Sequence, residues 1–396
     1  MATNHSALIK AAEQFLATAK EYKSDHLTQM DMLKQLDKMR LTLEGPMDPI
    51  LRQWDTIHTT AAMNLLVSTG ALQQIPTEGT ITSQELADAV GIDESVITRA
   101  MRVICVQGIA EEPETDVYAH NAKSLAYITG TSQYFFQMVL HQDLVMRKLP
   151  DYFKTHTKED LFDLRKSPYA HALDREGMTY YQVISDDPDR LHMFNQTLTQ
   201  MDQQMPILGM FPFAALKNQV EASPQKPFIV DVGGGRGQVL MSVQKEAPAG
   251  FGAKMILQDR PDVLAAIAQE DIPNIEKMEH DFFTPQPVKG AHIYLLRRIL
   301  HDFYEPVCIE IVKNIASAMD SDSRLVIGDF VVPDKTHLGD DSMVYWMDFL
   351  MMMLTGKEKT RKEFERILDA AGLQIVKVWP FAVGAQAIVE ARLKRA

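Results

Sequence analysis

The sequence contains little cysteine, little positive charge and no long apolar run. Two of its 396 residues are cysteine, Cys105 and Cys308, which excludes a framework of disulfide bonds and predicts a reducing compartment. The net charge of −13 argues against a nucleic-acid partner, because phosphate binding relies on clusters of lysine and arginine. No apolar run approaches the ~20 residues that a membrane helix needs, and the first residues carry no basic-then-apolar signal. We therefore expect a cytoplasmic protein without a membrane partner.

Glycine is concentrated in one short stretch, residues 228–240. An apolar strand ends there in Asp231, and a loop follows with four glycines before an apolar helix start: Gly233, Gly234, Gly235 and Gly237. The order of strand, glycine loop and helix is typical of a nucleotide cradle. The spacing D-x-G-x-G-x-G departs from the dinucleotide fingerprint G-x-G-x-x-G/A, because the last position is occupied by Gln238 or Leu240. An acid before the loop favours a ligand with a cationic amino group and no phosphates, such as S-adenosylmethionine (SAM).

The chain after the glycine loop alternates between strand and helix patterns. Further strands are predicted over 254–258, 291–296, 324–330, 374–379 and 387–390. Helices are predicted between most of them, over 237–246, 261–270, 306–319 and 360–371. This alternation predicts an α/β fold with a doubly wound, Rossmann-like sheet, whose ligands lie at the carboxyl ends of the strands.

The N-terminal part of the chain is expected to be mainly helical. Residues 7–43 have helical periodicity, and residues of about 48–128 form a small unit of two helices and a hairpin, typical of a winged helix. A DNA-binding role is disfavoured, because the second helix offers only Arg99 and Arg102, and the hairpin is acidic. We expect two domains, residues 1–190 for dimerisation and substrate contact and residues 191–396 for SAM. The amphipathic arm needs an apolar partner surface, which favours a homodimer.

Acidic residues follow several of the predicted strands, where this architecture places its ligands. Asp259 ends the second strand and is expected to accept hydrogen bonds from two ribose hydroxyls. Asp281 and Phe282 put a carboxylate beside an aromatic ring, which suits the edge and the face of an adenine. These positions extend the predicted cofactor site beyond the glycine loop.

His301 follows the strand predicted over 291–296 and is the candidate general base. Methyl transfer from a sulfonium to a hydroxyl requires a deprotonated acceptor, and a phenol with a pKa of ~10 does not ionise unaided at neutral pH. Histidine is suited to removing this proton, and a neighbouring carboxylate can hold its tautomer. Asp329 and Glu358 are the candidates for that carboxylate. We expect no metal, because histidines and acids do not cluster at ligand spacing in the sequence.

Taken together, these segments resemble the class I SAM-dependent O-methyltransferases of the caffeate and flavonoid type, particularly the fungal members. The resemblance also covers the N-terminal dimerisation domain, so it spans most of the chain. The matching motifs occur in this order: Asp231-Val-Gly-Gly-Gly-Arg-Gly237, Asp259-Arg-Pro-Asp-Val263, Asp281-Phe-Phe283, Leu296-Arg-Arg-Ile-Leu-His-Asp302 and Gly356-Lys-Glu-Lys-Thr360.

The resemblance implies how the cofactor is held. Asp231, Gly233 and Gly235 would hold the methionyl end of SAM. Asp259 would hold the ribose, with Arg260 beside it in the same motif. Asp281 and Phe282 would flank the adenine. Arg297 stands where the family usually has a lysine near the cofactor.

The resemblance also implies the catalytic residues. His301 would be the base, and Glu358 would be one of two acids that orient it. The second acid is usually glutamate, and the matching residue here is Asp329, one methylene shorter. The predicted reaction is O-methylation of an aromatic or polyketide-like secondary metabolite.

The same resemblance leaves a second reaction open. Some fungal proteins of similar sequence keep SAM but catalyse dehydration or pericyclic ring formation without transferring methyl, and the cofactor motifs do not separate the two groups. His141, in the helical domain, would then donate a hydrogen bond to a polyketide or pyridone carbonyl. The retention of His301 with Asp329 and Glu358 favours methyl transfer. The identity of the small-molecule substrate does not follow from the sequence.

Overall fold

The structure, a computed structural model, describes residues 5–382 and 384–394, apart from the side chains of residues 202–204. The chain forms two compact units whose segments alternate along the sequence. The first contains the chain up to Gln14, Leu36–Leu149 and Tyr181–Gln204, and the second contains Phe15–Gln35, Pro150–Tyr180 and the chain from Met205 onward. The predicted division at residue 190 stays a prediction.

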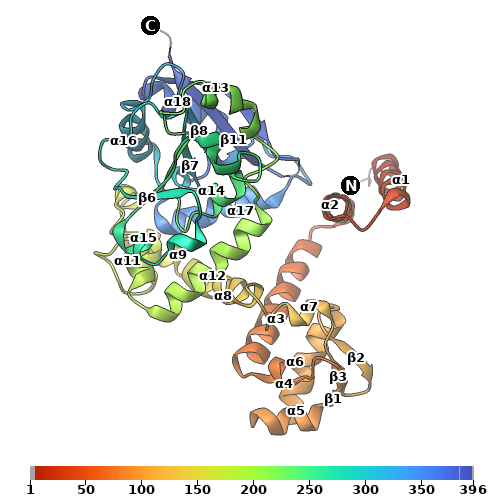
Figure 1. Ribbon diagram of the computed structural model, residues 1–396. Coiled ribbons are helices and arrows are strands. Elements are labelled where there is room, and N and C mark those ends of the chain that lie inside the picture. Colours follow the sequence, from red (N-terminus) through yellow and green to blue (C-terminus); the bar gives the residue numbers. More distant parts are fainter. Residues whose placement is uncertain (1–4, 383, 395–396) are drawn as a thin grey trace. The chain divides into compact units, whose positions relative to one another are not determined.

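The first unit consists mainly of helices around a small antiparallel sheet (Figure 1). The sheet has the strand order β1-β3-β2, with β1 (Ile81–Thr82), β2 (Glu111–Glu114) and β3 (Val117–Ala119). Its helices are α3 (Asp48–Ser68), α4 (Ala71–Gln74), α5 (Ser83–Val90), α6 (Glu94–Val106), α7 (Ala122–Leu125), α8 (Ser132–Arg147) and α12 (Pro188–Gln204). The winged-helix assignment and its dimer role remain predictions.

Local capping starts and ends the helices of this unit. The Thr82 hydroxyl accepts the Glu85 backbone N–H at 3.2 Å, and the Glu85 carboxylate accepts the Thr82 backbone N–H at 2.9 Å. This capping box opens α5, and Gly91, with φ of 66°, ends it. Asp93 then caps α6. The helices bury one common apolar core, which includes Leu66, Leu86, Ile97 and Ile104.

The helix predicted over residues 7–43 is wrong as a single element. The structure has two helices there, α1 (His5–Glu21) and α2 (His26–Leu43). Ser24 between them has φ of 60°, which a continuous right-handed helix does not allow. Asp25 then accepts the backbone N–H of Thr28 at 2.9 Å and starts α2 as a cap would.

An eight-stranded mixed sheet forms the centre of the second unit (Figure 1). Its path is β10-β11-β8-β7-β4-β5-β6, and β9 pairs with β8 beside this path. The strands are β4 (Ile229–Val232), β5 (Met255–Asp259), β6 (Ile275–Glu279), β7 (Ile293–Arg297), β8 (Arg324–Val332), β9 (Lys359–Thr360), β10 (Leu373–Pro380) and β11 (Gln386–Leu393). Strands β4 to β9 pair in parallel, and β11 pairs antiparallel with both neighbours. The predicted α/β class with a Rossmann-like sheet is confirmed. No bounds were predicted for β6 and β9, although Asp281 and Phe282 were expected to follow a strand, which is β6.

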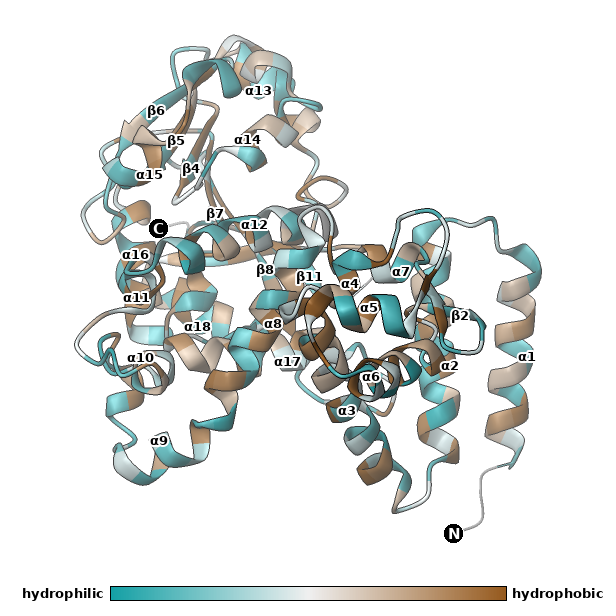
Figure 2. Ribbon diagram, turned by 90° about the horizontal axis from the view of Figure 1, so that it is seen from below, coloured by the Kyte–Doolittle hydropathy of each residue, from teal (hydrophilic) through white to brown (hydrophobic). Residues whose placement is uncertain are grey.

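Helices cover both faces of this sheet. Successive strand residues point to opposite faces, so neighbouring residues pack against different helices. Ile229 packs with α13 (Lys217–Glu221), α14 (Gln238–Val243) and α15 (Pro261–Ala265), whereas Val230 packs with α16 (Glu305–Ala316) and α18 (Arg361–Ala370). The central strands are accordingly apolar, as the brown colour of β4, β5 and β7 in Figure 2 shows. A parallel sheet covered on both faces brings its ligands to the strand ends.

The remaining elements of the second unit are mostly short. They include α9 (Leu149–Thr155), η1 (Asp160–Phe162), α10 (Pro168–Ala172), α11 (Tyr180–Ser185), which runs into the first unit, and the 3-10 turns η2 (Phe213–Leu216), η3 (Pro248–Gly252) and η4 (Gln269–Asp271). Near the strand ends lie η5 (Leu300–Asp302), α17 (Ser342–Met351) and η6 (Met352–Leu354).

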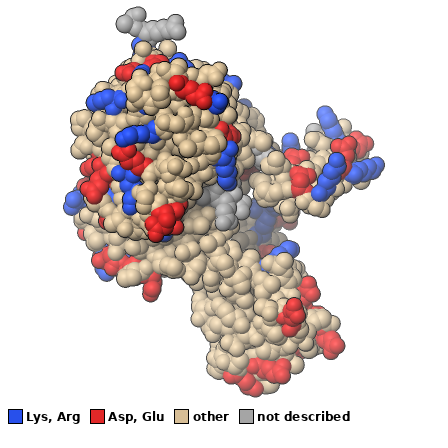
Figure 3. All heavy atoms as spheres, in the orientation of Figure 1, with Lys and Arg blue, Asp and Glu red and all other residues tan. Residues whose placement is uncertain are grey.

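Surface charge and helix hydrophobicity bear on two partners that the sequence disfavours, nucleic acid and membrane. In Figure 3, acidic side chains gather on the first unit around α5 and β2, where Glu111, Glu112 and Glu114 are all exposed. Such a surface repels phosphates, in line with the expectation of no nucleic-acid partner. Among the described residues, no helix combines the length and apolar character needed to cross a bilayer.

Candidate functional site

The glycine loop leaves the sheet at its topological switch point. Strand β4 lies between β5 and β7. The chain continues from β4 to β5 and β6 on one side of it and then crosses back to β7 on the other side. Asp231, the second-last residue of this strand, has a fully buried side chain. Gly233, Gly235 and Gly237 follow with φ of 71°, 58° and 81°, a region that residues with a Cβ rarely adopt. In doubly wound folds this crevice is the ligand site.

The loop is packed so closely at Gly233 and Gly234 that a side chain is excluded at both positions. A Cβ on Gly233 would lie 2.7 Å from Cδ1 of Ile299 and 3.6 Å from Cε1 of Phe282. A Cβ on Gly234 would lie 2.5 Å from both Oδ2 of Asp231 and Cδ1 of Leu257. The backbone of the loop is therefore the surface presented to a ligand. Phe282 lies beside it, as the sequence predicts.

Asp259 connects the end of β5 to this loop. Its Oδ2 accepts the backbone N–H of Gly235 at 2.8 Å, and its Oδ1 accepts the backbone N–H of Arg260 at 2.8 Å. Burial raises the pKa of Asp259 above its usual value, although both of these hydrogen bonds lower it. The Arg260 guanidinium lies at the surface and pairs with Asp262 at 3.3 Å.

The other predicted cofactor residues lie around the same loop. Asp281 is exposed and accepts the backbone N–H of Phe283 at 3.0 Å. The Phe282 ring is 6.1 Å from the Phe303 ring, at an angle of 71°. Arg297, at the end of β7, donates a hydrogen bond to the backbone carbonyl of Met205.

These residues fit SAM. The bare glycine backbone allows close approach of the methionyl end, and Asp231 places a buried acid under the loop for a cationic amino group. The Asp259 carboxylate, already beside the loop, has the chemistry to accept ribose hydroxyls. Phe282 offers an aromatic face within reach of Gly233. These roles remain predictions for the individual residues.

His301 lies in η5, the turn that follows β7. Its Nδ1 is 2.8 Å from Oε1 of Glu358, and the two side chains are 7% and 0% exposed. The second ring nitrogen, Nε2, is 3.4 Å from Oδ1 of Asp302. A carboxylate accepts hydrogen bonds, so the neutral imidazole carries its hydrogen on Nδ1. This leaves Nε2 as the atom that can take a proton.

The charges around His301 favour its protonated form. Burial lowers the pKa of His301, but Glu358, Asp302 and Asp329 act in the opposite direction and together raise it to about 9. The imidazolium formed by proton removal would therefore be stabilised where it arises.

Asp329 lies within electrostatic reach of His301 without a hydrogen bond between them. It is 4% exposed, and neither of its carboxylate oxygens has a hydrogen-bond partner among the residues that the structure describes. Burial raises its pKa to about 7, although His301 lowers it. The parallel pairing of β8 with β9, with Val331 opposite Lys359, brings Asp329 near Glu358.

Residues 356–359 hold the turn that carries His301. The backbone N–H of Lys357 donates to the His301 carbonyl at 2.8 Å, and that of Glu358 donates to Oδ1 of Asp348 at 2.9 Å. A Cβ on Gly356 would collide with the His301 carbonyl oxygen, so this approach requires glycine. The base and its acid are thus fixed together through the backbone as well as through their side chains.

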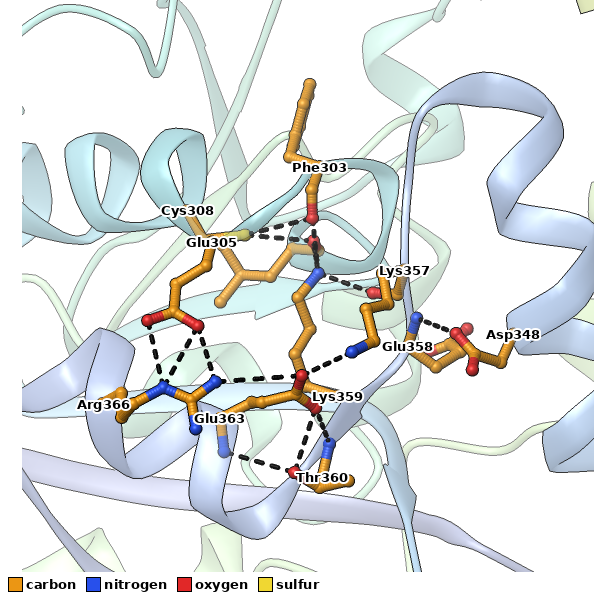
Figure 4. A network of polar contacts seen from close by, with 11 residues as sticks. Phe303, Glu305, Cys308, Asp348, Lys357, Glu358, Lys359, Thr360, Glu363 and Arg366 are labelled. Carbon is orange, nitrogen blue, oxygen red and sulfur yellow. Dashed lines mark hydrogen bonds and ion pairs between the residues drawn. The ribbon is translucent and has the colours of Figure 1, made fainter. Parts of the chain in front are cut away.

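The buried side chain of Lys359 also holds the turn that carries His301 (Figure 4). Its ammonium, 2% exposed, donates to the carbonyls of Leu300, of Phe303 at 2.6 Å and of Lys357 at 2.6 Å. Leu300 and Phe303 flank His301 on both sides. This lysine lies in the motif from Gly356 to Thr360, but the motif predicts no role for it. The feature that could have indicated its role is an ionisable residue directly after Glu358, in a segment that is mostly buried.

Two other residues near the turn, Ile299 and Tyr180, were not predicted from the sequence. Ile299 fills the space above Gly233. Tyr180 is buried, which raises the pKa of its phenol, and the charge of Asp302 raises it further. Both are apolar or aromatic residues in ordinary sequence surroundings, so no local pattern distinguishes them.

His141 lies in α8, in the first unit, whereas the other candidate residues belong to the second. Burial lowers its pKa, as does Arg190, and Asp187 raises it. Its proposed contact with a substrate carbonyl remains a prediction.

The chain is similar to known proteins over its whole length. Residues 149–374 match the family of O-methyltransferase domains. The chain is 39% identical over 401 residues to the O-methyltransferase hmp5 of Hypomyces subiculosus, with 100% of both chains covered. The solved structure of LepI in complex with SAM has a TM-score of 0.83 at 26% identity, covering 99% of this chain and 100% of that one. The structure of OxaC in complex with sinefungin and meleagrin has a TM-score of 0.82 at 27% identity, covering 98% and 99%.

Proposed function

Because the chain belongs to the family of SAM-dependent O-methyltransferases, we propose that it methylates a hydroxyl of an aromatic or polyketide-like secondary metabolite, with His301 as the general base. One observation carries the proposal: a buried His301–Glu358 pair at the carboxyl end of the sheet, near the glycine loop that suits SAM. SAM supplies an electrophilic methyl group on a positively charged sulfur. The residues of the chain must then make the acceptor oxygen nucleophilic.

His301 performs this step through Nε2. Glu358 accepts the hydrogen of Nδ1, so the lone pair of Nε2 is available to the substrate hydroxyl. The proton moves from the hydroxyl to Nε2, and the new imidazolium charge is balanced by Glu358 and the nearby acids. Since the same acids raise the pKa of His301 to about 9, the neutral base becomes more abundant as the pH rises towards that value.

The proposed substrate class is supported by the relatives. The curated relatives are fungal O-methyltransferases, and OxaC was solved with meleagrin. Retention of the base and both acids favours methyl transfer over a reaction that only rearranges the substrate.

A second candidate function is a pericyclic reaction or dehydration with SAM retained. The observation that favours it is the similarity to a solved structure described as "A Pericyclic Reaction enzyme", with a TM-score of 0.83 and 26% identity over 99% of this chain. In that reading, His141 would donate a hydrogen bond to a substrate carbonyl.

Product analysis separates the two functions. The purified protein is incubated with SAM and a panel of fungal aromatic and polyketide metabolites, and S-adenosylhomocysteine is quantified beside the organic product. Methyl transfer predicts equal amounts of S-adenosylhomocysteine and methylated product, and none with sinefungin, which has no methyl group to give. Conversion of substrate to an isomer or dehydrated product without S-adenosylhomocysteine would reject methyl transfer.

We propose that the protein forms a homodimer. Five large apolar side chains at the start of α3 and just before it are more than half exposed, which is unusual for a free helix face: Met47 at 58%, Ile50 at 54%, Leu51 at 51%, Trp54 at 60% and Ile57 at 53%. Light scattering should give twice the chain mass for the wild type and less for Trp54→Glu. Val106→Glu, which changes an exposed apolar residue on α6, serves as the control. A monomeric wild type would reject the dimer.

A further inference from the structure

Two histidines and a glutamate meet in the second unit, away from the glycine loop and His301. His156 follows α9, His171 lies in α10, and Glu176 lies in the turn after α10. One potential ligand atom from each residue lies within 4.8 Å of the other two. Their spacing in the sequence gives no metal motif, so the sequence alone predicts no metal.

The three side chains converge on a single carboxylate oxygen. Oε1 of Glu176 is 3.0 Å from Nε2 of His156 and 2.7 Å from Nδ1 of His171. Tetrahedral Zn²⁺ binds imidazole nitrogen and carboxylate oxygen at about 2.0–2.2 Å, so its ligand atoms lie about 3.3 Å apart. The observed separations would have to open by only a few tenths of an ångström.

The hydrogen bonds of His156 leave its Nε2 facing Glu176. Its Nδ1 is 3.1 Å from the carbonyl oxygen of Tyr152, which can only accept. The Thr155 hydroxyl, 3.0 Å from the same nitrogen, donates its own hydrogen to the Asp151 carbonyl. Nδ1 therefore carries a hydrogen, and Nε2 lies 3.0 Å from the Glu176 carboxylate, whose negative charge a proton on Nε2 or a metal ion would balance. A histidine that donates one N–H to a backbone carbonyl has the usual arrangement of a metal ligand.

Tyr152 holds both rings in this orientation. It is 1% exposed, and its ring stacks on His156 with centroids 4.1 Å apart and an angle of 15°. The same ring contacts His171 edge-on at 5.6 Å. The tyrosine hydroxyl is itself fixed by donating to the Lys166 carbonyl at 2.8 Å. The two histidine ligands are therefore positioned in advance.

We propose that His156 Nε2, His171 Nδ1 and the Glu176 carboxylate bind one divalent transition-metal ion such as Zn²⁺. Imidazole nitrogen and carboxylate oxygen suit this class of ion, and a fourth position is left for water. The side-chain exposures of 10%, 26% and 42% show that an ion can enter from the Glu176 side.

The ion would have a structural role, not a catalytic one. It joins the end of α9 to α10 and the turn beyond it, and α10 packs against η6, the turn that precedes Gly356 and Glu358. A metal that binds the folded state alone stabilises it, so bound metal raises the unfolding temperature. The proposal is independent of the reaction that the protein catalyses.

Metal binding is tested on the full chain, without a histidine tag and after removal of metal with a chelator. Titration with Co²⁺ should give the visible absorption of a tetrahedral site, saturating at one ion per chain. Zn²⁺ should compete for that site, raise the unfolding temperature, and bind more weakly at acidic pH, because a protonated imidazole cannot coordinate a metal.

Variants locate the site. His171→Ala and Glu176→Gln should each weaken Zn²⁺ binding at least about 10-fold. His337→Ala, which removes an exposed histidine 3.6 Å from Asp340, should leave it unchanged. Circular dichroism confirms that each variant is folded, and Glu176→Gln keeps the side-chain shape. Wild-type protein that gives no tetrahedral Co²⁺ spectrum, or that binds Zn²⁺ no more tightly than Glu176→Gln, would overturn the proposal and leave the cluster as an ion pair.

Discussion

The cofactor loop and the base cluster lie at the same end of one sheet but are built in different ways. The loop is a continuous run of residues, 231–237, whose property is a bare backbone with three glycines at positive φ. The base cluster takes His301, Asp329 and Glu358 from separate segments and buries all three charges. The cofactor loop therefore depends on local backbone geometry, whereas the base cluster depends on electrostatic interactions between distant segments. Changes in the two should affect different measured quantities.

Removing the base should have the largest effect. His301→Ala is expected to lower kcat about 10²–10⁴-fold, the usual contribution of a general base. SAM affinity, measured by calorimetry, should stay close to that of the wild type, because the glycine loop is untouched. A variant with full turnover would show that another group removes the proton.

Lys359 tests whether the base cluster depends on its buried support. Lys359→Met leaves three backbone carbonyls without their donor, which should cost about 3 kcal/mol of unfolding free energy in urea. Turnover should fall more than SAM affinity. The matched control is Lys357→Met, because that lysine is 42% exposed and pairs with Glu363 at the surface. Equal losses in the two variants would contradict a special role for Lys359.

Gly234 tests the cofactor loop in the same manner. Gly234→Ala puts a methyl group into the space of Asp231 and Leu257, at a cost of about 1–3 kcal/mol. SAM affinity should fall about 10-fold, with a smaller change in the rate at saturating SAM. Arg236→Ala, at an exposed position of the same loop, should change neither value. If Gly234→Ala lowers kcat without changing SAM affinity, the separation between loop and cluster fails.

Glu358 is expected to have a smaller effect on rate and a distinct effect on pH dependence. The acids raise the pKa of His301 to about 9, so wild-type activity should rise as the pH increases towards that value. Glu358→Gln removes the main raising charge, so its pH profile should shift to lower pH while the maximal rate falls about 10-fold. A profile that does not move would mean that Glu358 does not set the pKa of His301.

The same shift has a consequence for stability. A raised pKa in the folded state means that protonated His301 stabilises the fold. This contribution is complete below about 6.5 and is lost as the pH rises through about 9. Thermal unfolding across this range should show a decline in the wild type that is smaller in His301→Ala.

The cofactor end was largely predictable from the sequence, because its information is local. The loop from Asp231 to Gly237, the acid Asp259 and the ring of Phe282 all follow predicted strands, and the parallel sheet brings strand ends together. The caps of α5 and α6 were predictable for the same reason. The break at Ser24 was not, because an amphipathic pattern continues across it on both sides.

The base cluster was predictable only in part. The sequence names His301 by its position after a predicted strand and Asp329 by its place within one, and the family resemblance names all three residues, Glu358 included. Their hydrogen bonds were not predictable, because the structure pairs His301 with Glu358 and leaves Asp329 unbonded. The support from Lys359 depends on the pairing of β9 with β8, and β9 is only two residues long.

The sequence by itself determined the α/β class, the glycine loop and the candidates for the base, because strand periodicity, positive-φ glycines and ionisable residue types are properties of short segments. Only the tertiary structure decided which acid bonds to His301, that Lys359 holds the turn, and that His156, His171 and Glu176 converge. The reason is physical: hydrogen bonds and pKa values depend on burial and on distances of a few ångströms, which are set by the packing of segments far apart in the chain.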